Sequence, residues 1–276
     1  MATRKAGKIF VGIGGWNFPP WRGSFYPKGL TQARELHFAS RELTSIEINS
    51  TFYGLQKPAT FRKWHDETPD AFVFSVKAPR FVMQRKRLAE GASSIERFLE
   101  SGILELGAKL GPINWQLAPD KLFDAGELTE FLALLPRKVG GRVLRHALEA
   151  RHKSFDCEAA IELARKHHVA LVEAGDSAYP RIEARTAPFS YLRVMGTKAS
   201  TPNGYAPVAL ARWRERAQTL ARDGDVFLYF ISGAKVRNPQ AARALLKALA
   251  SPLVTGASRP RARTAASRGT GTKLTR

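Results

Sequence analysis

The sequence is poor in cysteine and contains no long apolar run. Cys157 is the only cysteine, which excludes a disulfide within the chain and a thiolate metal cluster held by one copy. No apolar stretch approaches the roughly 20 residues that a membrane-spanning helix requires. The Ile9–Ile13 stretch after the first basic residues is too short and too rich in glycine for a signal-peptide core. These absences predict a cytoplasmic protein with no membrane segment.

Acidic residues are also scarce. Asp and Glu number 24 against 44 Lys and Arg, so the formal net charge is +20. Residues 251–276 contain basic residues but no acid, and Ser, Thr, Ala, Gly and Arg dominate their composition. This composition is typical of a disordered tail, whose Arg-rich part, residues 259–276, can bind nucleic acid through phosphates without sequence preference. A solvated extension with no partner is the alternative.

Short apolar runs alternate with longer amphipathic stretches along the rest of the chain. The runs predict about eight buried strands: Ile9–Trp16, Ser45–Tyr53, Phe72–Ala78, Pro112–Leu117, Val143–Ala150, Val169–Ala174, Ser190–Met195 and Val226–Ile231. The stretches between them predict helices: Thr31–Arg41, Pro58–Glu67, Ser94–Leu106, Glu127–Leu135, Ser154–Lys166, Pro207–Arg222 and Pro239–Ala250. The connection from Ala174 to Ser190 lacks a helix, because Pro180 and Pro188 interrupt it.

This alternation predicts an α/β protein, a single (β/α)8 TIM-type barrel over residues 8–250. A flexible segment, residues 1–7, precedes the barrel, and the disordered basic tail, residues 251–276, follows it. The competing fold is an open doubly wound sheet, which would place a glycine-rich phosphate loop after the first strand. Gly12, Gly14 and Gly15 suggest such a loop, but the prolines at 19 and 20 prevent a helix from starting directly after it.

Barrels of this kind bind their ligands at the carboxyl ends of the strands. In the run Ser45–Tyr53 the alternation places Glu47, Asn49 and Thr51 on one face. Residues expected there as acids and bases are Glu47, Glu149, His152 and Asp176. Residues expected to bind the substrate are Trp16, Asn49, Tyr53, Lys77, Gln116, Arg151, Arg193 and Tyr229. A structural role is the alternative for each of them, because buried charges need partners whether or not they catalyse.

The charge distribution points to an anionic ligand. Basic residues outnumber acidic ones in the segments after the predicted strands, whereas the segments before the strands are nearly balanced. A mouth of one sign concentrates ligands of the opposite sign. We therefore expect a small phosphorylated or otherwise anionic substrate, held by Lys77, Arg151 and Arg193, with Glu47 or Glu149 as general acid or base. The reaction and any cofactor stay open.

Three other interpretations remain. The basic mouth and the tail could together bind nucleic acid, with aromatic side chains stacking on bases. The barrel could instead bind a small anion without turning it over. A metal site built from carboxylates and His152 has no tight ligand spacing in its favour, and the neighbouring cations disfavour it.

Ordered motifs between residues 8 and 250 resemble the YecE-like family, also called DUF72. They are Gly12–Trp16, Trp21–Pro27, Ile46–Tyr53, Phe74–Pro79, Leu110–Leu117, Glu149–His152, Ala174–Ser177, Tyr191–Arg193 and Tyr229–Phe230. The resemblance implies a TIM-type barrel and no particular reaction. The chain departs from the family pattern at Gly14, where the family usually has serine, at Phe155, where it usually has tryptophan, and at Ile231 and Ser232. The last two replace asparagines at the predicted mouth, so the ligand of this chain can differ from that of its relatives.

Overall fold

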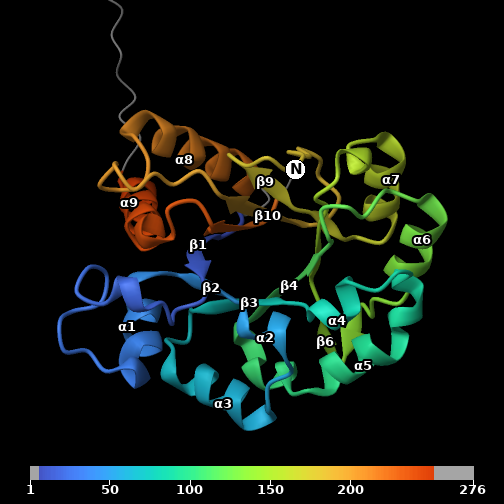
Figure 1. Ribbon diagram of the computed structural model, residues 1–276, viewed down its shortest axis with the longest axis horizontal. Coiled ribbons are helices and arrows are strands. Elements are labelled where there is room, and N and C mark those ends of the chain that lie inside the picture. The colour runs from blue at the N-terminus through green and yellow to red at the C-terminus, as the bar shows by residue number, and fades with distance from the viewer. Residues whose placement is uncertain (1–5, 252–276) are drawn as a thin grey trace, which may run out of the picture.

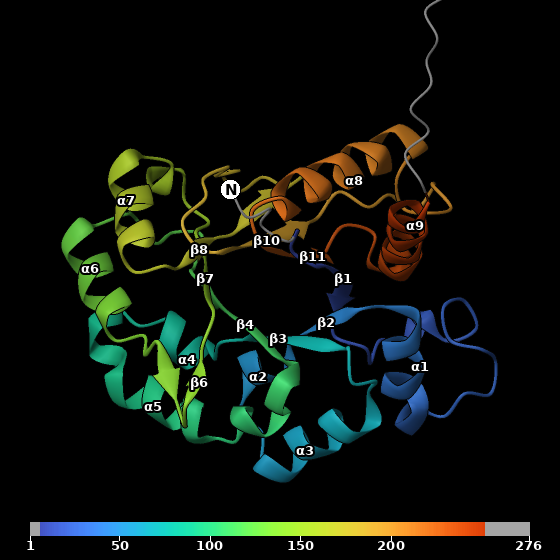
Figure 2. The same ribbon diagram turned by 180° about the vertical axis from the view of Figure 1, so that it is seen from behind.

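The computed structural model describes residues 6–251. A parallel sheet rolled into a barrel forms its centre, and helices cover the outside (Figures 1 and 2). In sheet order the strands are β8 (Ala170–Leu171), β7 (His146–Glu149), β4 (Leu110–Gln116), β3 (Val73–Lys77), β2 (Ser45–Ile48), β1 (Ile9–Gly14), β11 (Asp225–Phe230), β10 (Phe189–Val194) and β9 (Glu173–Gly175). Every pair of hydrogen-bonded neighbours in this sheet is parallel.

An interrupted strand joins the two edges of the sheet. β8 pairs with β7, β9 pairs with β10, and only Val172 lies between β8 and β9. The Val172 amide donates a hydrogen bond to the Leu148 carbonyl oxygen at 3.0 Å. The run 170–175 therefore serves as the sixth of eight parallel strands, and the predicted (β/α)8 barrel is confirmed.

Helices follow most strands, as predicted. The longer ones are α1 (Glu35–Glu42), α3 (Pro58–Glu67), α5 (Ala92–Glu100), α6 (Ala125–Ala133), α7 (Glu158–Lys166), α8 (Pro207–Ala221) and α9 (Asn238–Ala250). The short ones are α2 (Ser50–Tyr53) and α4 (Arg80–Met83). Short 3₁₀ segments are η1 (Pro19–Trp21), η2 (Gln32–Arg34), η3 (Leu88–Gly91), η4 (Ile103–Lys109), η5 (Lys153–Phe155) and η6 (Lys235–Arg237). The predicted helix Ser94–Leu106 is wrong beyond residue 100, because left-handed Gly102 separates α5 from η4.

The interior of the barrel becomes more polar from the amino ends of the strands to their carboxyl ends. Phe10 and Phe227 stack at the amino ends with ring centroids 4.8 Å apart. Tyr191 and Tyr229 lie one layer higher, fully buried. Gly12 allows β1 to approach β2 closely at that level, because a Cβ at position 12 would lie only 1.9 Å from the Ser45 carbonyl oxygen. Charged side chains fill the layer at the carboxyl ends.

Two further local predictions are wrong. The second strand ends at Ile48, because Asn49 takes a right-handed helical conformation and starts α2. The fifth strand starts at His146, and an antiparallel hairpin of β5 (Lys138–Val139) and β6 (Arg142–Val143) precedes it. Its turn consists of Gly140 and Gly141, both with positive φ, as tight hairpins require.

Some predictions concern residues outside 6–251. Most of the predicted tail, including 259–276, and residues 1–5 lie outside the described range. The Gly7 amide, in the segment predicted to be flexible, donates to the Ala221 carbonyl oxygen at 2.7 Å. The domain boundaries stay predictions. Among the helices of the described range, none combines the length and the apolar character needed to span a bilayer.

An ion-pair network covers the barrel where the helix between β9 and β10 is missing, as predicted. Buried Glu173 points outward and accepts hydrogen bonds from Arg181 at 2.7 Å and from Arg216 of α8 at 2.8 Å. Glu183 pairs with the same two arginines from a more exposed position. The network thus ties the irregular connection 176–188 to α8.

We expect Glu173→Gln to lower the free energy of unfolding by about 1–3 kcal/mol, because two guanidinium groups lose a buried carboxylate. Urea unfolding followed by circular dichroism measures the loss. Glu183→Gln is the matched control, since its side chain is 45 % exposed against 6 % for Glu173. Equal effects of the two substitutions would contradict this account of the missing helix.

Candidate functional site

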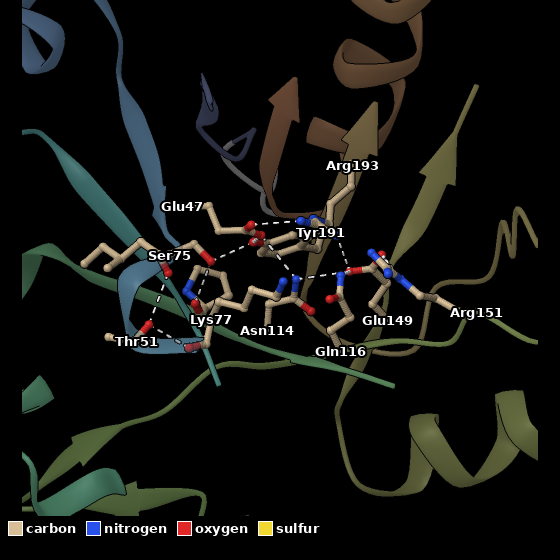
Figure 3. Close-up of polar contacts among 12 residues, drawn as sticks. Glu47, Thr51, Ser75, Lys77, Asn114, Gln116, Glu149, Arg151, Tyr191 and Arg193 are labelled. Carbon is tan, nitrogen blue, oxygen red and sulfur yellow. Dashed lines mark hydrogen bonds and ion pairs between the residues drawn. The ribbon is translucent and has the colours of Figure 1, made fainter. Parts of the chain in front are cut away.

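A buried guanidinium bridges two glutamates at the carboxyl ends of the strands (Figure 3). Arg193 of β10 donates from Nη2 to Glu47 Oε1 of β2 at 3.0 Å and from Nη1 to Glu149 Oε2 of β7 at 2.5 Å. All three side chains are almost completely shielded from solvent. Strands that are distant in sequence are therefore joined by one cation.

Neutral donors complete the hydrogen bonding of both carboxylates. Glu47 accepts from the Tyr191 hydroxyl at 2.5 Å and from Asn114 Nδ2 at 3.2 Å. Glu149 accepts from Gln116 Nε2 at 2.7 Å. The Asn114 amide also lies 3.4 Å from Glu149 Oε2, so it is shared between the two acids. Few acceptor positions on either carboxylate are left for a substrate proton.

These contacts determine the protonation states of Glu149 and Tyr191. Burial alone would raise the pKa of Glu149, but the Arg193 and Arg151 guanidinium groups outweigh it and lower this pKa from 4.5 to about 2. Burial and the neighbouring Glu47 carboxylate raise the pKa of Tyr191 well above its usual range, so its hydroxyl remains a donor. At neutral pH Glu149 is ionised and is a weak base.

Two further cations stand at the edge of this network. Lys77, the last residue of β3, is 9 % exposed, and its Nζ lies 3.8 Å from the centre of the Phe52 ring. Within residues 6–251 no carboxylate lies within ion-pairing distance of this ammonium group. Arg151 donates from Nε to Glu149 at 3.0 Å and stacks on Tyr179 with its guanidinium carbon 4.4 Å from the ring centre.

Lys77 is the group of this site that titrates near physiological pH. Burial lowers the pKa of its ammonium from 10.5 to about 8, and the charge of Arg193 acts in the same direction, against Glu47 and Glu149. The side chain can therefore hold an anion when protonated, and it can exchange a proton without a large free-energy cost.

Six of the residues expected at the site meet in this network: Glu47, Lys77, Gln116, Glu149, Arg151 and Arg193. Asn49 and Trp16 lie half-buried at the same end of the barrel, after β2 and β1. Tyr53 is 69 % exposed on α2. Tyr229 lies in the layer below, where its hydroxyl is 2.7 Å from the Ser45 hydroxyl.

Two expected acids or bases make local contacts instead. His152 accepts a hydrogen bond from the Ser154 amide at 3.2 Å and so caps η5. Asp176 has a positive φ, and its carboxylate accepts from Trp213 Nε1 of α8 at 3.1 Å. The left-handed turn directs Asp176 toward α8 and away from the network around Arg193.

Sequence reasoning missed Asn114 and Tyr191, both fully buried in the network. The signal was present, because each lies two residues before a residue already selected on the same strand. Within residues 6–251 no three His, Cys, Asp or Glu side chains converge in a way that could hold a metal ion. The cation between Glu47 and Glu149 is Arg193.

Comparison with known proteins decides the family. Residues 10–264 match the family described as "Protein of unknown function DUF72". The chain belongs to the DUF72 family. The resemblance seen in its motifs is therefore confirmed.

DUF72 relatives share the fold. A DUF72 protein of Thermotoga maritima superposes with a TM-score of 0.71 at 23% identity, covering 88% of this chain and 99% of that one. A second, from Enterococcus faecalis, gives 0.67 at 17% identity, covering 88% and 98%. The YecE protein of Escherichia coli is 27% identical over 150 residues, which are 53% of this chain and 50% of YecE. The match thus spans about half the length of that relative.

Two departures from the DUF72 pattern are neighbours in space. A Cβ placed on Gly14 would lie 2.7 Å from Asn49 Nδ2 and 3.6 Å from the Ile231 side chain. A serine at position 14 would therefore require Asn49 to move. Gly14, Asn49 and Ile231 therefore lie together on one side of the barrel mouth.

We expect the stabilising effect of Glu149 to depend on pH. Because folding lowers its pKa, the stabilisation is complete above about pH 5 and is lost as the pH falls toward 2. Glu149→Gln should therefore cost on the order of 2–3 kcal/mol of unfolding free energy at pH 7 and much less at pH 3. Urea titrations at several pH values measure the difference.

The control is Glu130→Gln, at an exposed glutamate that pairs with Arg87. It should change stability by less than about 0.5 kcal/mol at either pH. A cost of Glu149→Gln that does not shrink at low pH would contradict the charge assignment.

Proposed function

We propose that the protein binds a small anionic compound at the carboxyl ends of the strands and acts on it by proton transfer. Lys77 and Arg151 hold the anion, and Lys77 gives or takes the proton. The substrate class is a small phosphorylated or carboxylated metabolite. Hydrolysis, isomerisation and elimination all include such a transfer.

The cations of the site differ in how they are paired with carboxylates, and this difference carries the proposal. Both Glu47 and Glu149 neutralise Arg193, whereas Lys77 has no carboxylate partner within residues 6–251. The terminal nitrogens of Arg151 make no hydrogen bond to the described residues, since its bond to Glu149 uses Nε. Figure 3 shows Lys77 and Arg151 on opposite sides of Asn114, Gln116 and Glu149. An anion that contacts both cations would receive a charge-assisted hydrogen bond from each.

The glutamates contribute to this site by holding the arginine side chains in place. With a pKa of about 2, Glu149 is a poor match to proton transfer at neutral pH, where Lys77, with a pKa of about 8, is a better one. We therefore assign Glu47 and Glu149 to fixing the Arg193 and Arg151 guanidinium groups, in place of the acid–base role expected from sequence. Such preorganised charge costs no rearrangement when a substrate binds.

A thermal-shift screen tests the proposal. The compounds are inorganic phosphate, sugar phosphates, nucleotides, dicarboxylates and a short oligonucleotide. We expect a small anion to stabilise the parent protein, and Lys77→Met to weaken its affinity by about tenfold or more, because one charge-assisted contact is lost. Lys57→Met is the matched control, which removes an exposed charge that precedes α3.

Stabilisation by the oligonucleotide alone would favour the nucleic-acid interpretation. Small-anion binding that survives Lys77→Met and Arg151→Gln would show that the proposed site is wrong.

The affinity should also depend on pH. Lys77 must be protonated to attract the anion, and its pKa in the free protein is about 8. We expect the affinity of the best anion to fall between pH 7 and pH 9.5, and the residual affinity of Lys77→Met to be flat over that range. Isothermal titration calorimetry at four pH values measures this. A parent affinity that stays constant above pH 8 would contradict the role of Lys77.

A further inference from the structure

A separate cavity lies at the opposite end of the barrel, at the amino ends of β7 and β10. Its volume is about 540 Å³. We propose that it is a second binding site, for an anionic compound that also carries an apolar or aromatic part. Among the side chains that line it are Arg137, Val143, Leu144, His167 and Phe189.

Three irregular parts of the fold create this cavity. The β5–β6 hairpin contributes Val143, and the turn between α7 and β8 contributes His167 and His168. The segment 185–188, which belongs to the connection without a helix, forms a third wall. The cavity therefore lies where the connection between β9 and β10 lacks a helix and where the β5–β6 hairpin precedes β7.

The charge of the walls selects the sign of the ligand. Four arginines line the cavity, and none of its lining residues is acidic. Arg145 and Arg185 pair with Asp225 and Asp223 at 3.3 and 3.2 Å. Arg137 has no ion-pair partner within residues 6–251. Its charge is available to a ligand, whereas Arg145, Arg165 and Arg185 are each paired with a carboxylate.

The remaining walls select the apolar part of the ligand. Val143 is 64 % exposed, and the buried Leu144 and Phe189 line the same cavity. His167 adds a buried Nε2 that has no hydrogen-bond partner within the described residues. Small-molecule sites combine apolar walls with a few polar groups at volumes of roughly 300–1,000 Å³. The cavity thus suits a compound of about nucleotide size, whose ring contacts Val143 and whose anion faces Arg137.

This inference is independent of the proposed function. The cavity shares no residue with the Glu47–Arg193–Glu149 network, and the two lie at opposite ends of the strands. A ligand of one site can therefore be separated from a ligand of the other by substitution.

Calorimetric titration with adenosine diphosphate and with inorganic phosphate tests it. We expect the diphosphate to bind more tightly than phosphate, because it provides a ring and also carries more negative charge. Arg137→Gln should weaken diphosphate binding by about three- to tenfold. This is the loss expected when one charge contact is removed at an exposed or partly buried position. Lys138→Gln is the matched control, since it removes an equal exposed charge next to Arg137 but outside the lining.

Retention of binding in Lys77→Met, with loss in Arg137→Gln, supports a second site. Loss in Lys77→Met but not in Arg137→Gln places the diphosphate at the carboxyl ends and overturns the inference. Equal weakening by Arg137→Gln and Lys138→Gln would indicate general attraction to a basic surface and would overturn it as well. So would the absence of diphosphate binding to the parent protein.

Discussion

The ion pairs of Arg193 with Glu47 and Glu149 are the interaction on which the rest of the site depends. Removing a guanidinium and two carboxylates from water costs several kcal/mol per ion, and the cost is offset only when each charge is paired and hydrogen-bonded. Here both acids contact Arg193, and Tyr191, Asn114 and Gln116 supply further donors. The network therefore holds β2, β7 and β10 in one register and sets the positions of the side chains around it.

The two ends of the barrel differ because its interior is layered. Phenylalanines close the amino end, tyrosines bonded to serines fill the middle, and ions occupy the carboxyl end. The aromatic layers exclude water from below, which strengthens the electrostatic interactions above them. The same exclusion lowers the pKa of Lys77. A structural network and a reactive group are thus consequences of one arrangement.

The general fold could be predicted from sequence, because buried parallel strands and amphipathic helices have different periods. Lys77 and Arg193 could be selected because they lie on predicted strands near the carboxyl ends. Alternation placed Glu47, Asn49 and Thr51 on one strand face, but the strand ends before Asn49. Asp176 could not be placed, since a left-handed residue directs it toward α8. The β5–β6 hairpin was missed because two-residue strands show no periodicity, although Gly140–Gly141 carried a turn signal. Which charged residues of different strands pair with each other depends on how the barrel closes. The sequence of a single strand does not show this.

Crystals soaked in tungstate would test the central claim most directly. Tungstate is a small anion with a strong anomalous signal, so its position needs no prior choice of substrate. The account predicts a peak within hydrogen-bonding distance of Lys77 Nζ and the Arg151 terminal nitrogens, and its loss in crystals of Lys77→Met. A well-occupied anion elsewhere, with none between Lys77 and Arg151, would contradict the proposal that these two cations form the binding site.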